Sequence, residues 1–102
     1  MQEQQSLPAF LKILGSEKKT MRDKYGVLHL AIFGSYAKHE QNKESDVDLI
    51  VELEDGYKTF DNYMELKFFL EEKLQKKVDL ALKDSLRKEL KTGMLREAVY
   101  VS

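Results

Sequence analysis

Three short apolar segments constrain the fold of this chain more than any other feature. They are 27–33 (VLHLAIF), 46–53 (DVDLIVEL) and 77–82 (KVDLAL). Runs of this length, bounded by glycine or charged residues, are typical of buried or half-buried strands. In the second segment four apolar residues fall at every second position and so share one face, and they are Val47, Leu49, Val51 and Leu53. The sequence therefore predicts a small sheet that packs against a core.

Helical patterns lie between the predicted strands. The segment 8–25 carries an apolar stripe at helical spacing, made up of Leu7, Phe10, Leu11, Leu14, Met21 and Tyr25. Ser6 and Pro8 suit the start of a helix, and Gly26 suits a left-handed stop. The Gly-Ser pair at 15–16 is a candidate position for a bend or a break in this helix.

A second helix is predicted over 59–76, with Thr59 as its cap and a stripe of Tyr63, Leu66, Leu70 and Leu74. Residues 85–98 are predicted to be helical in two short pieces around Gly93, and the final VYV is predicted to be extended. The order helix, strand, turn, strand, helix, strand, helix predicts an α/β (α+β) fold with a small sheet and helices packed against it. No linker or repeat interrupts this order, so residues 1–102 are expected to form one domain.

Composition excludes several classes of protein. Hydrophobic residues make up 42% of the chain and charged residues 34%, which fits a globular protein and argues against disorder. The formal net charge of −1 provides no basic field, so we expect no direct nucleic-acid binding. Cysteine is absent, which excludes disulfides and cysteine-ligated zinc. No apolar run approaches the roughly 18 residues of a membrane span, and the start lacks the plan of a secretory signal, so we expect a cytoplasmic protein without a membrane partner.

Three aspartates are the main candidates for chemistry. Asp46 and Asp48 are two residues apart, so in a strand their carboxylates lean from one face, with Cα atoms about 6.6 Å apart. Asp79 interrupts the apolar run 77–82, although charged residues are depleted in strands and costly to bury unpaired. If the two strands are neighbours, these carboxylates can hold divalent cations, and magnesium prefers such hard oxygens. Asp79 is also a candidate general base for an incoming hydroxyl.

A glycine-serine turn follows the first predicted strand. Gly34 and Ser35 are expected to open a short helix through 36–38, where glycine allows close backbone approach and the amides of a helix start favour a phosphate. The Ser35 hydroxyl can donate to a phosphate oxygen, and Lys38 adds a flexible positive charge. The sequence therefore predicts a phosphate-binding turn close to the carboxylates.

Each of these features also has a local explanation. Glycine-serine after a strand is a common turn, and Asp-x-Asp is frequent on solvated rims. Asp79 can pair with Lys76 or Lys77. The features favour a functional site when they are taken together, because they occur in order and each falls on the expected element.

Other polar and aromatic residues are predicted to have structural roles. His29 is expected to be packed and hydrogen-bonded in its strand, His39 to be exposed in a loop, and 87–91 to be a solvated helix face. One group of aromatic residues is too large for a single core-facing side, so some of its members are candidates for a partner surface. These residues are Tyr57, Phe60, Tyr63, Phe68 and Phe69.

The segment 34–51 (GSYAKHEQNKESDVDLIV) resembles the signature of the minimal nucleotidyltransferases, a branch of the DNA polymerase β-like superfamily. The matching residues are Gly34, Ser35, Ala37, Ser45, Asp46, Asp48 and Leu49, and Asp79 matches the third acid of the family. The leading helix, the helix between the acids and the ending LREAVYV are also similar, so the resemblance spans nearly the whole chain. The family usually has arginine and then glycine where this chain has Lys38 and His39, and lysine cannot form the bidentate fork of arginine.

The resemblance implies a nucleotidyltransferase fold, with a small mixed β-sheet flanked by helices. It implies magnesium-dependent transfer of a nucleoside monophosphate from a triphosphate to a hydroxyl, with two Mg²⁺ ions and ATP as substrate. It assigns the metal and catalytic roles to Asp46, Asp48 and Asp79. It assigns the binding of the nucleotide to Gly34, Ser35, Lys38 and Ser45.

Three functions are compatible with these residues. Small members of the family are typically paired with a HEPN-domain ribonuclease toxin, so the leading hypothesis is an antitoxin that adenylylates a tyrosine of that toxin. A non-catalytic antitoxin that neutralises the toxin by binding is the second hypothesis. A small-molecule transferase of the aminoglycoside type is the third, and the lack of a second, acceptor-holding domain disfavours it.

Overall fold

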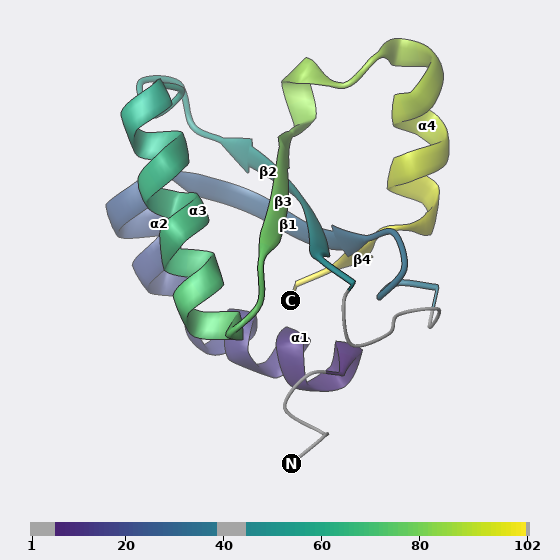
Figure 1. The fold of residues 1–102 in the computed structure, drawn as a ribbon. Coiled ribbons are helices and arrows are strands. Elements are labelled where there is room, and N and C mark those ends of the chain that lie inside the picture. Colours follow the sequence, from purple (N-terminus) through teal and green to yellow (C-terminus); the bar gives the residue numbers. More distant parts are fainter. Residues whose placement is uncertain (1–5, 39–44, 102) are drawn as a thin grey trace.

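The computed structural model describes residues 6–38 and 45–101, with the backbone alone at Leu90 (Figure 1). His39, predicted to be an exposed loop residue, lies outside the described residues. The elements in chain order are α1 (Leu7–Ser16), α2 (Lys18–Tyr25), β1 (Val27–Phe33), β2 (Val47–Leu53), α3 (Phe60–Leu74), β3 (Val78–Leu82), the 3₁₀ turn Lys83–Ser85, α4 (Lys88–Glu97) and β4 (Val99–Tyr100).

The four strands form one mixed sheet in the order β3-β2-β1-β4. β1 pairs antiparallel with β2 and with β4, whereas β2 pairs parallel with β3. Parallel neighbours require a crossover connection, and α3 supplies it. The α/β fold with a small mixed sheet is confirmed. The crossover also brings Asp48 opposite Asp79 in the parallel register.

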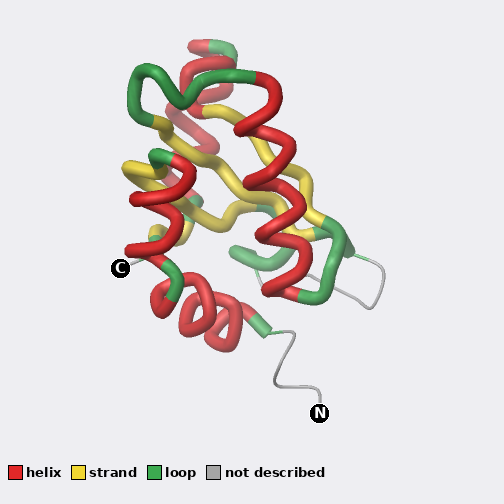
Figure 2. The backbone as a smooth tube through the Cα atoms, turned by 90° about the vertical axis from the view of Figure 1, so that its left-hand side faces the viewer, coloured by secondary structure: helices red, strands yellow, loops and turns green. Residues whose placement is uncertain are grey.

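The helices divide unequally between the two faces of the sheet. Figures 1 and 2 show α2 and α3 side by side on one face and α4 on the other. The covered face holds the core, in which several side chains are almost fully excluded from solvent. These are Phe10 and Leu14 of α1, Met21 of α2, Val47, Leu49 and Val51 of β2, and Leu66, Leu70 and Leu74 of α3. The intervening residues of β2 therefore point to the face on the α4 side.

The predicted first helix is two helices that meet at Glu17, which confirms the break expected near 15–16. The Ser6 side chain accepts a hydrogen bond from the amide of Ala9 at 3.3 Å and caps α1. α2 ends at Gly26, where φ is +70° and a Cβ atom would collide with the ring of Tyr57. Glycine is therefore required at this stop both by conformation and by space.

The predictions for the second half of the chain agree with the structure to different extents. α3 begins after Thr59, whose side chain accepts a hydrogen bond from the Asn62 amide at 3.1 Å, as expected. The helix ends at Leu74 and not at residue 76, because the backbone of Gln75 is left-handed, with φ of 55°. The two helical pieces expected around Gly93 are wrong, because α4 runs unbroken through that glycine. The final extended segment is confirmed as β4, which hydrogen-bonds to β1.

The side chain of His29 was predicted to be packed, and this is wrong. It is 65% exposed, and its Nε2 lies 3.9 Å from Oε1 of Glu52 on the neighbouring strand. The aromatic group divides as the sequence suggested: Tyr57, Tyr63 and Phe69 pack against the core, whereas Phe60 and Phe68 are 76% and 57% exposed. None of the helices in the described ranges is long and apolar enough to cross a membrane.

Candidate active site

Asp48 and Asp79 lie side by side on the sheet face that α1, α2 and α3 leave open. They are register partners in the parallel pair β2 and β3, and neighbouring strands are about 4.8 Å apart. The sequence places them there because Val47 and Leu49 on β2, like Val78 and Leu80 on β3, are buried in the core. The alternating aspartates must then point the other way, so the predicted convergence of these two acids is confirmed.

Asp46 directly precedes β2 instead of lying within it, and its side chain is exposed. It nevertheless acts on Asp48. Burial of the Asp48 carboxyl, followed by the negative charges of Asp79 and Asp46, raises the pKa of Asp48 above its ordinary value. All three predicted acids therefore contribute to one negative site centred on Asp48.

This arrangement suits a cation for which the protein supplies only some of the ligands. Within the described residues, no three histidine, cysteine, aspartate or glutamate side chains are close enough to form a metal-binding group by themselves. Mg²⁺ commonly takes one or two carboxylates and completes its shell with water and substrate phosphates. A positive ion beside Asp48 would also offset the burial and the repulsion that raise its pKa. The donor set therefore fits a magnesium–nucleotide complex.

Gly34 borders the acids directly. It follows β1, whose last residue, Phe33, is the register partner of Asp48. The φ angle of Gly34 is +73°, and a Cβ atom added there would collide with the carboxylate of Asp48. Glycine is thus required because the backbone turns in the left-handed region against an acidic side chain. The predicted closeness of the glycine-serine turn to the acids is confirmed.

The turn itself is a single hydrogen-bonded loop and not the short helix expected from the sequence. The amide of Lys38 donates to the carbonyl of Gly34 at 3.1 Å, and no helix starts here in the described part of the chain. Tyr36 holds the turn in place: it is 1% exposed, and its ring lies 5.0 Å from that of Phe10 on α1. Sequence reasoning missed this role, although an aromatic residue within a polar loop is a signal of anchoring.

The predicted nucleotide-binding side chains differ in burial and in their ion pairs. Ser35 and Ser45 are half-buried on either side of the segment 39–44. Lys38 forms an ion pair with Glu97 at the end of α4, with 3.3 Å between Nζ and Oε1.

The sequence matches a family model described as a nucleotidyltransferase domain over residues 16–101. The Methanocaldococcus jannaschii protein MJ1379, provisionally named a protein adenylyltransferase, is 42% identical over 98 residues, which cover 94% of this chain and 98% of that protein. The protein adenylyltransferase MntA of Thermococcus cleftensis is 39% identical over 89 residues, which cover 87% of this chain and 89% of that protein.

Solved structures agree with the fold. The structure of a minimal nucleotidyltransferase superposes with a TM-score of 0.73 at 32% identity and covers 87% of this chain and 93% of that one. Two more distant neighbours share the fold. A toxin–antitoxin complex with AMP-PNP superposes with a TM-score of 0.69 at 21% identity and covers 86% of this chain and 72% of that one. A tri-AMPylated Shewanella oneidensis HEPN toxin in complex with its MNT antitoxin superposes with a TM-score of 0.63 at 20% identity and covers 90% of this chain and 71% of that one. With three acids centred on Asp48, a glycine turn against them, and these relatives, the chain belongs to the nucleotidyltransferase-domain family, as a minimal nucleotidyltransferase of the MNT type.

Proposed function

We propose that this protein is an antitoxin that transfers AMP from ATP to a tyrosine hydroxyl of a cognate HEPN-domain ribonuclease toxin. The observation that carries the proposal is the meeting of Gly34, Asp48 and Asp79 at one point on the open sheet face. The relatives support the type of reaction, since one bears the name protein adenylyltransferase and one structural neighbour is an AMPylated HEPN toxin with its MNT antitoxin.

In the proposed reaction, the tyrosine oxygen attacks the α-phosphorus of ATP. A bond forms between these atoms, the bond from the α-phosphorus to the bridging oxygen breaks, and pyrophosphate leaves. Bound Mg²⁺ would supply positive charge to the phosphates, as in other phosphoryl-transfer sites. A tyrosine hydroxyl has an ordinary pKa of about 10, so it needs a base at neutral pH.

The three acids differ in exposure, and this divides their proposed roles. Asp48 is half-buried with a raised pKa, so it gains most from a neighbouring cation, and with Asp46 it would hold the metal. Asp79 is exposed, so an acceptor can reach it, and its carboxylate would take the tyrosine proton as well as complete the metal site.

The phosphates would lie along the turn that follows β1. The backbone at Gly34 and the Ser35 hydroxyl would bind the β- and γ-phosphates, with Lys38 and Ser45 at the rim of the site. Lys38 would exchange its ion pair with Glu97 for a phosphate oxygen.

The test is the mass of the toxin after incubation with this protein, ATP and Mg²⁺. The mass should increase by one or more AMP groups with the wild type and with Glu52→Gln, and should stay unchanged with Asp48→Asn or Asp79→Asn. Glu52 is the matched control because it lies on the same strand and face as Asp48 but outside the acid cluster. AMP transfer that persists in both aspartate variants would refute the proposed site.

The exposed aromatic residues favour a second candidate, an antitoxin that acts by binding alone. Phe60 and Phe68 on α3 are both largely exposed, as a partner-binding surface requires. This function predicts that Asp48→Asn still neutralises the toxin without ATP. Neutralisation that requires ATP would rule it out.

A further inference from the structure

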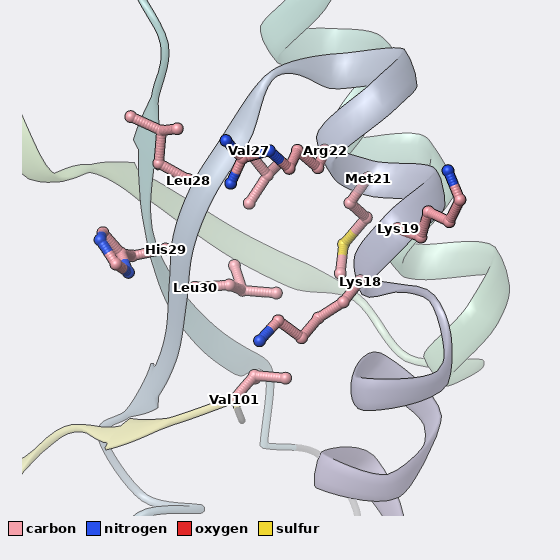
Figure 3. A pocket seen from close by; sticks show the side chains of 9 residues that line it. All are labelled: Lys18, Lys19, Met21, Arg22, Val27, Leu28, His29, Leu30 and Val101. Carbon is pink, nitrogen blue, oxygen red and sulfur yellow. The ribbon is translucent and has the colours of Figure 1, made fainter.

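A second candidate site lies at the end of β1 that is far from Gly34. Here α2 and β1 enclose a cavity of about 490 Å³, which Val101 also borders (Figure 3). This volume is in the range of ordinary ligand pockets. The cavity contains none of the three acids of the candidate active site, because it borders the first half of β1 and not its end.

The walls of this cavity combine an apolar floor with a basic rim. Met21, Val27 and Leu30 form the floor. Lys18 and Arg22 of α2 are one helical turn apart, so they project from the same side of the helix. Figure 3 shows Lys18 reaching toward Leu30 and Val101, while Arg22 lies beside Val27.

The charges of Lys18 and Arg22 are available to a ligand. Neither residue takes part in an ion pair within the described part of the chain, whereas Lys19 is paired with Asp23 at 2.8 Å. No acidic residue is among the described residues that line the cavity. An anionic group placed here would therefore meet two unneutralised cations over an apolar surface.

Among the residues that the structure describes, no strand lies next to the backbone beside the cavity. β4 pairs with Ala31 and Ile32, and the last contact along this edge is the hydrogen bond from the Val101 amide to the Leu30 carbonyl at 2.9 Å. Beyond that point no described strand covers the edge of β1 at 27–28, where the register with β2 is irregular. The backbone groups on an uncovered strand edge are unpaired, and such an edge accepts an extended peptide.

We propose that this cavity binds an extended segment of a partner protein that carries apolar residues and aspartate or glutamate at every second position, so that both kinds of side chain point toward α2. The segment would continue the line of β4 along β1. Its apolar side chains would contact Met21, Val27 and Leu30, and its acidic side chains would pair with Lys18 and Arg22. The site is separate from the acid cluster, so this proposal does not depend on the reaction proposed above.

Peptide selection on the intact protein tests the proposal without choosing the sequence in advance. A displayed library of random peptides roughly eight residues long spans a typical strand of five to six residues. The selected peptides should carry apolar residues and aspartate or glutamate at every second position. Lys18→Glu and Arg22→Glu should each weaken their binding about tenfold. Lys24→Glu is the matched control, since it reverses an exposed charge on the same helix outside the cavity, and it should leave binding unchanged.

The binding place is checked by amide chemical shifts of the ¹⁵N-labelled protein with one selected peptide. The signals of Leu28, His29 and Val101 should move, those of Gly34 and Asp79 should not, and well-dispersed spectra of each variant show that it is folded. The proposal is overturned if the library yields no acidic peptides, if Lys24→Glu weakens binding as much as Lys18→Glu, or if the peptide perturbs the acid cluster. It is also overturned if glutamate or inorganic phosphate alone displaces the peptide at similar concentration, because the site would then recognise a small anion.

Discussion

Replacing Asp48 with asparagine should stabilise the protein in the absence of divalent cations, even though it removes a residue of the proposed active site. Burial and the charges of Asp79 and Asp46 raise the pKa of Asp48, which means that its ionised form is unfavourable in the folded state. Asparagine keeps the shape of the side chain and removes the charge. Both the desolvation cost and the repulsion are then relieved.

The size of this gain follows from the spacing of β2 and β3. Two unit charges about 5 Å apart repel by roughly 0.8 kcal/mol in water and by roughly 3 kcal/mol at an effective dielectric constant of about 20. Asp79 is exposed and Asp48 only half-buried, so the value near the aqueous limit applies. We expect about 1 kcal/mol, which corresponds to about 4–8 °C in Tm for a domain of this size.

Urea denaturation at pH 7 and low ionic strength, followed by circular dichroism, measures the difference. Glu52→Gln is the matched control, because Glu52 lies on the same strand and face but faces a cation, with 3.5 Å between its Oε1 and Nζ of Lys83. The Glu52→Gln substitution should leave the free energy of unfolding unchanged or lower it by about 0.2–1 kcal/mol. The reasoning is refuted if Asp48→Asn is no more stable than the wild type, or if Glu52→Gln gains as much.

The advantage of Asp48→Asn should depend on pH in a defined direction. Because the pKa of Asp48 is higher in the folded state than its ordinary value of 3.8, the folded protein binds this proton more tightly than the unfolded chain. The contribution of Asp48 to stability therefore falls as pH rises from about 3.8 through the raised pKa. The difference between variant and wild type should be full at neutral pH and vanish below pH 3.8. Mg²⁺ with a nucleotide should stabilise the wild type and reverse the order.

Three further outcomes follow from the turn after β1. Gly34→Ala should lower the free energy of unfolding by about 1–3 kcal/mol in urea denaturation, because φ is +73° and the new Cβ meets Asp48. Gly93→Ala is the control, and it should be neutral or stabilising because the space around Gly93 is open. Equal effects of the two substitutions would contradict the placement of the turn. Tyr36→Ala should cost about 3 kcal/mol in the same assay and Tyr36→Phe much less, because the ring fills the contact with Phe10, and a tolerated alanine would show that this anchor is absent. Glu97→Gln should tighten binding of a non-hydrolysable ATP analogue about threefold by calorimetry, since it frees Lys38, while unchanged or weaker binding would show that Lys38 does not serve the nucleotide.

The sequence predicted the strands well because their pattern reflects burial. The alternation in 46–53 determined which residues of β2 enter the core, and this in turn placed Asp48 on the opposite face. The crossover helix between β2 and β3 made the two strands parallel neighbours, so the meeting of Asp48 with Asp79 followed from topology. Periodicity thus predicted the face on which these acids lie, whereas their register was known only from the structure.

Features that depend on tertiary contacts were not predictable in the same way. Gly93 suggested a break by its low helix propensity, but α4 continues through it, because propensity is a weak term that context overrides. The apolar strand around His29 predicts a packed side chain, yet the position of His29 in β1 turns it to the α4 side, where it is exposed. The ion pair of Lys38 with Glu97 joins residues that are far apart in the sequence, and no local pattern indicates it.

The most direct test of the acid site is the place at which a divalent ion binds together with the nucleotide. Mn²⁺ added with a non-hydrolysable ATP analogue should broaden the amide signals of Gly34, Asp48 and Asp79 in the ¹⁵N-labelled protein, and Asp48→Asn should abolish this broadening. Broadening centred on another part of the chain, or unchanged in Asp48→Asn, would contradict the assignment of these carboxylates to the metal.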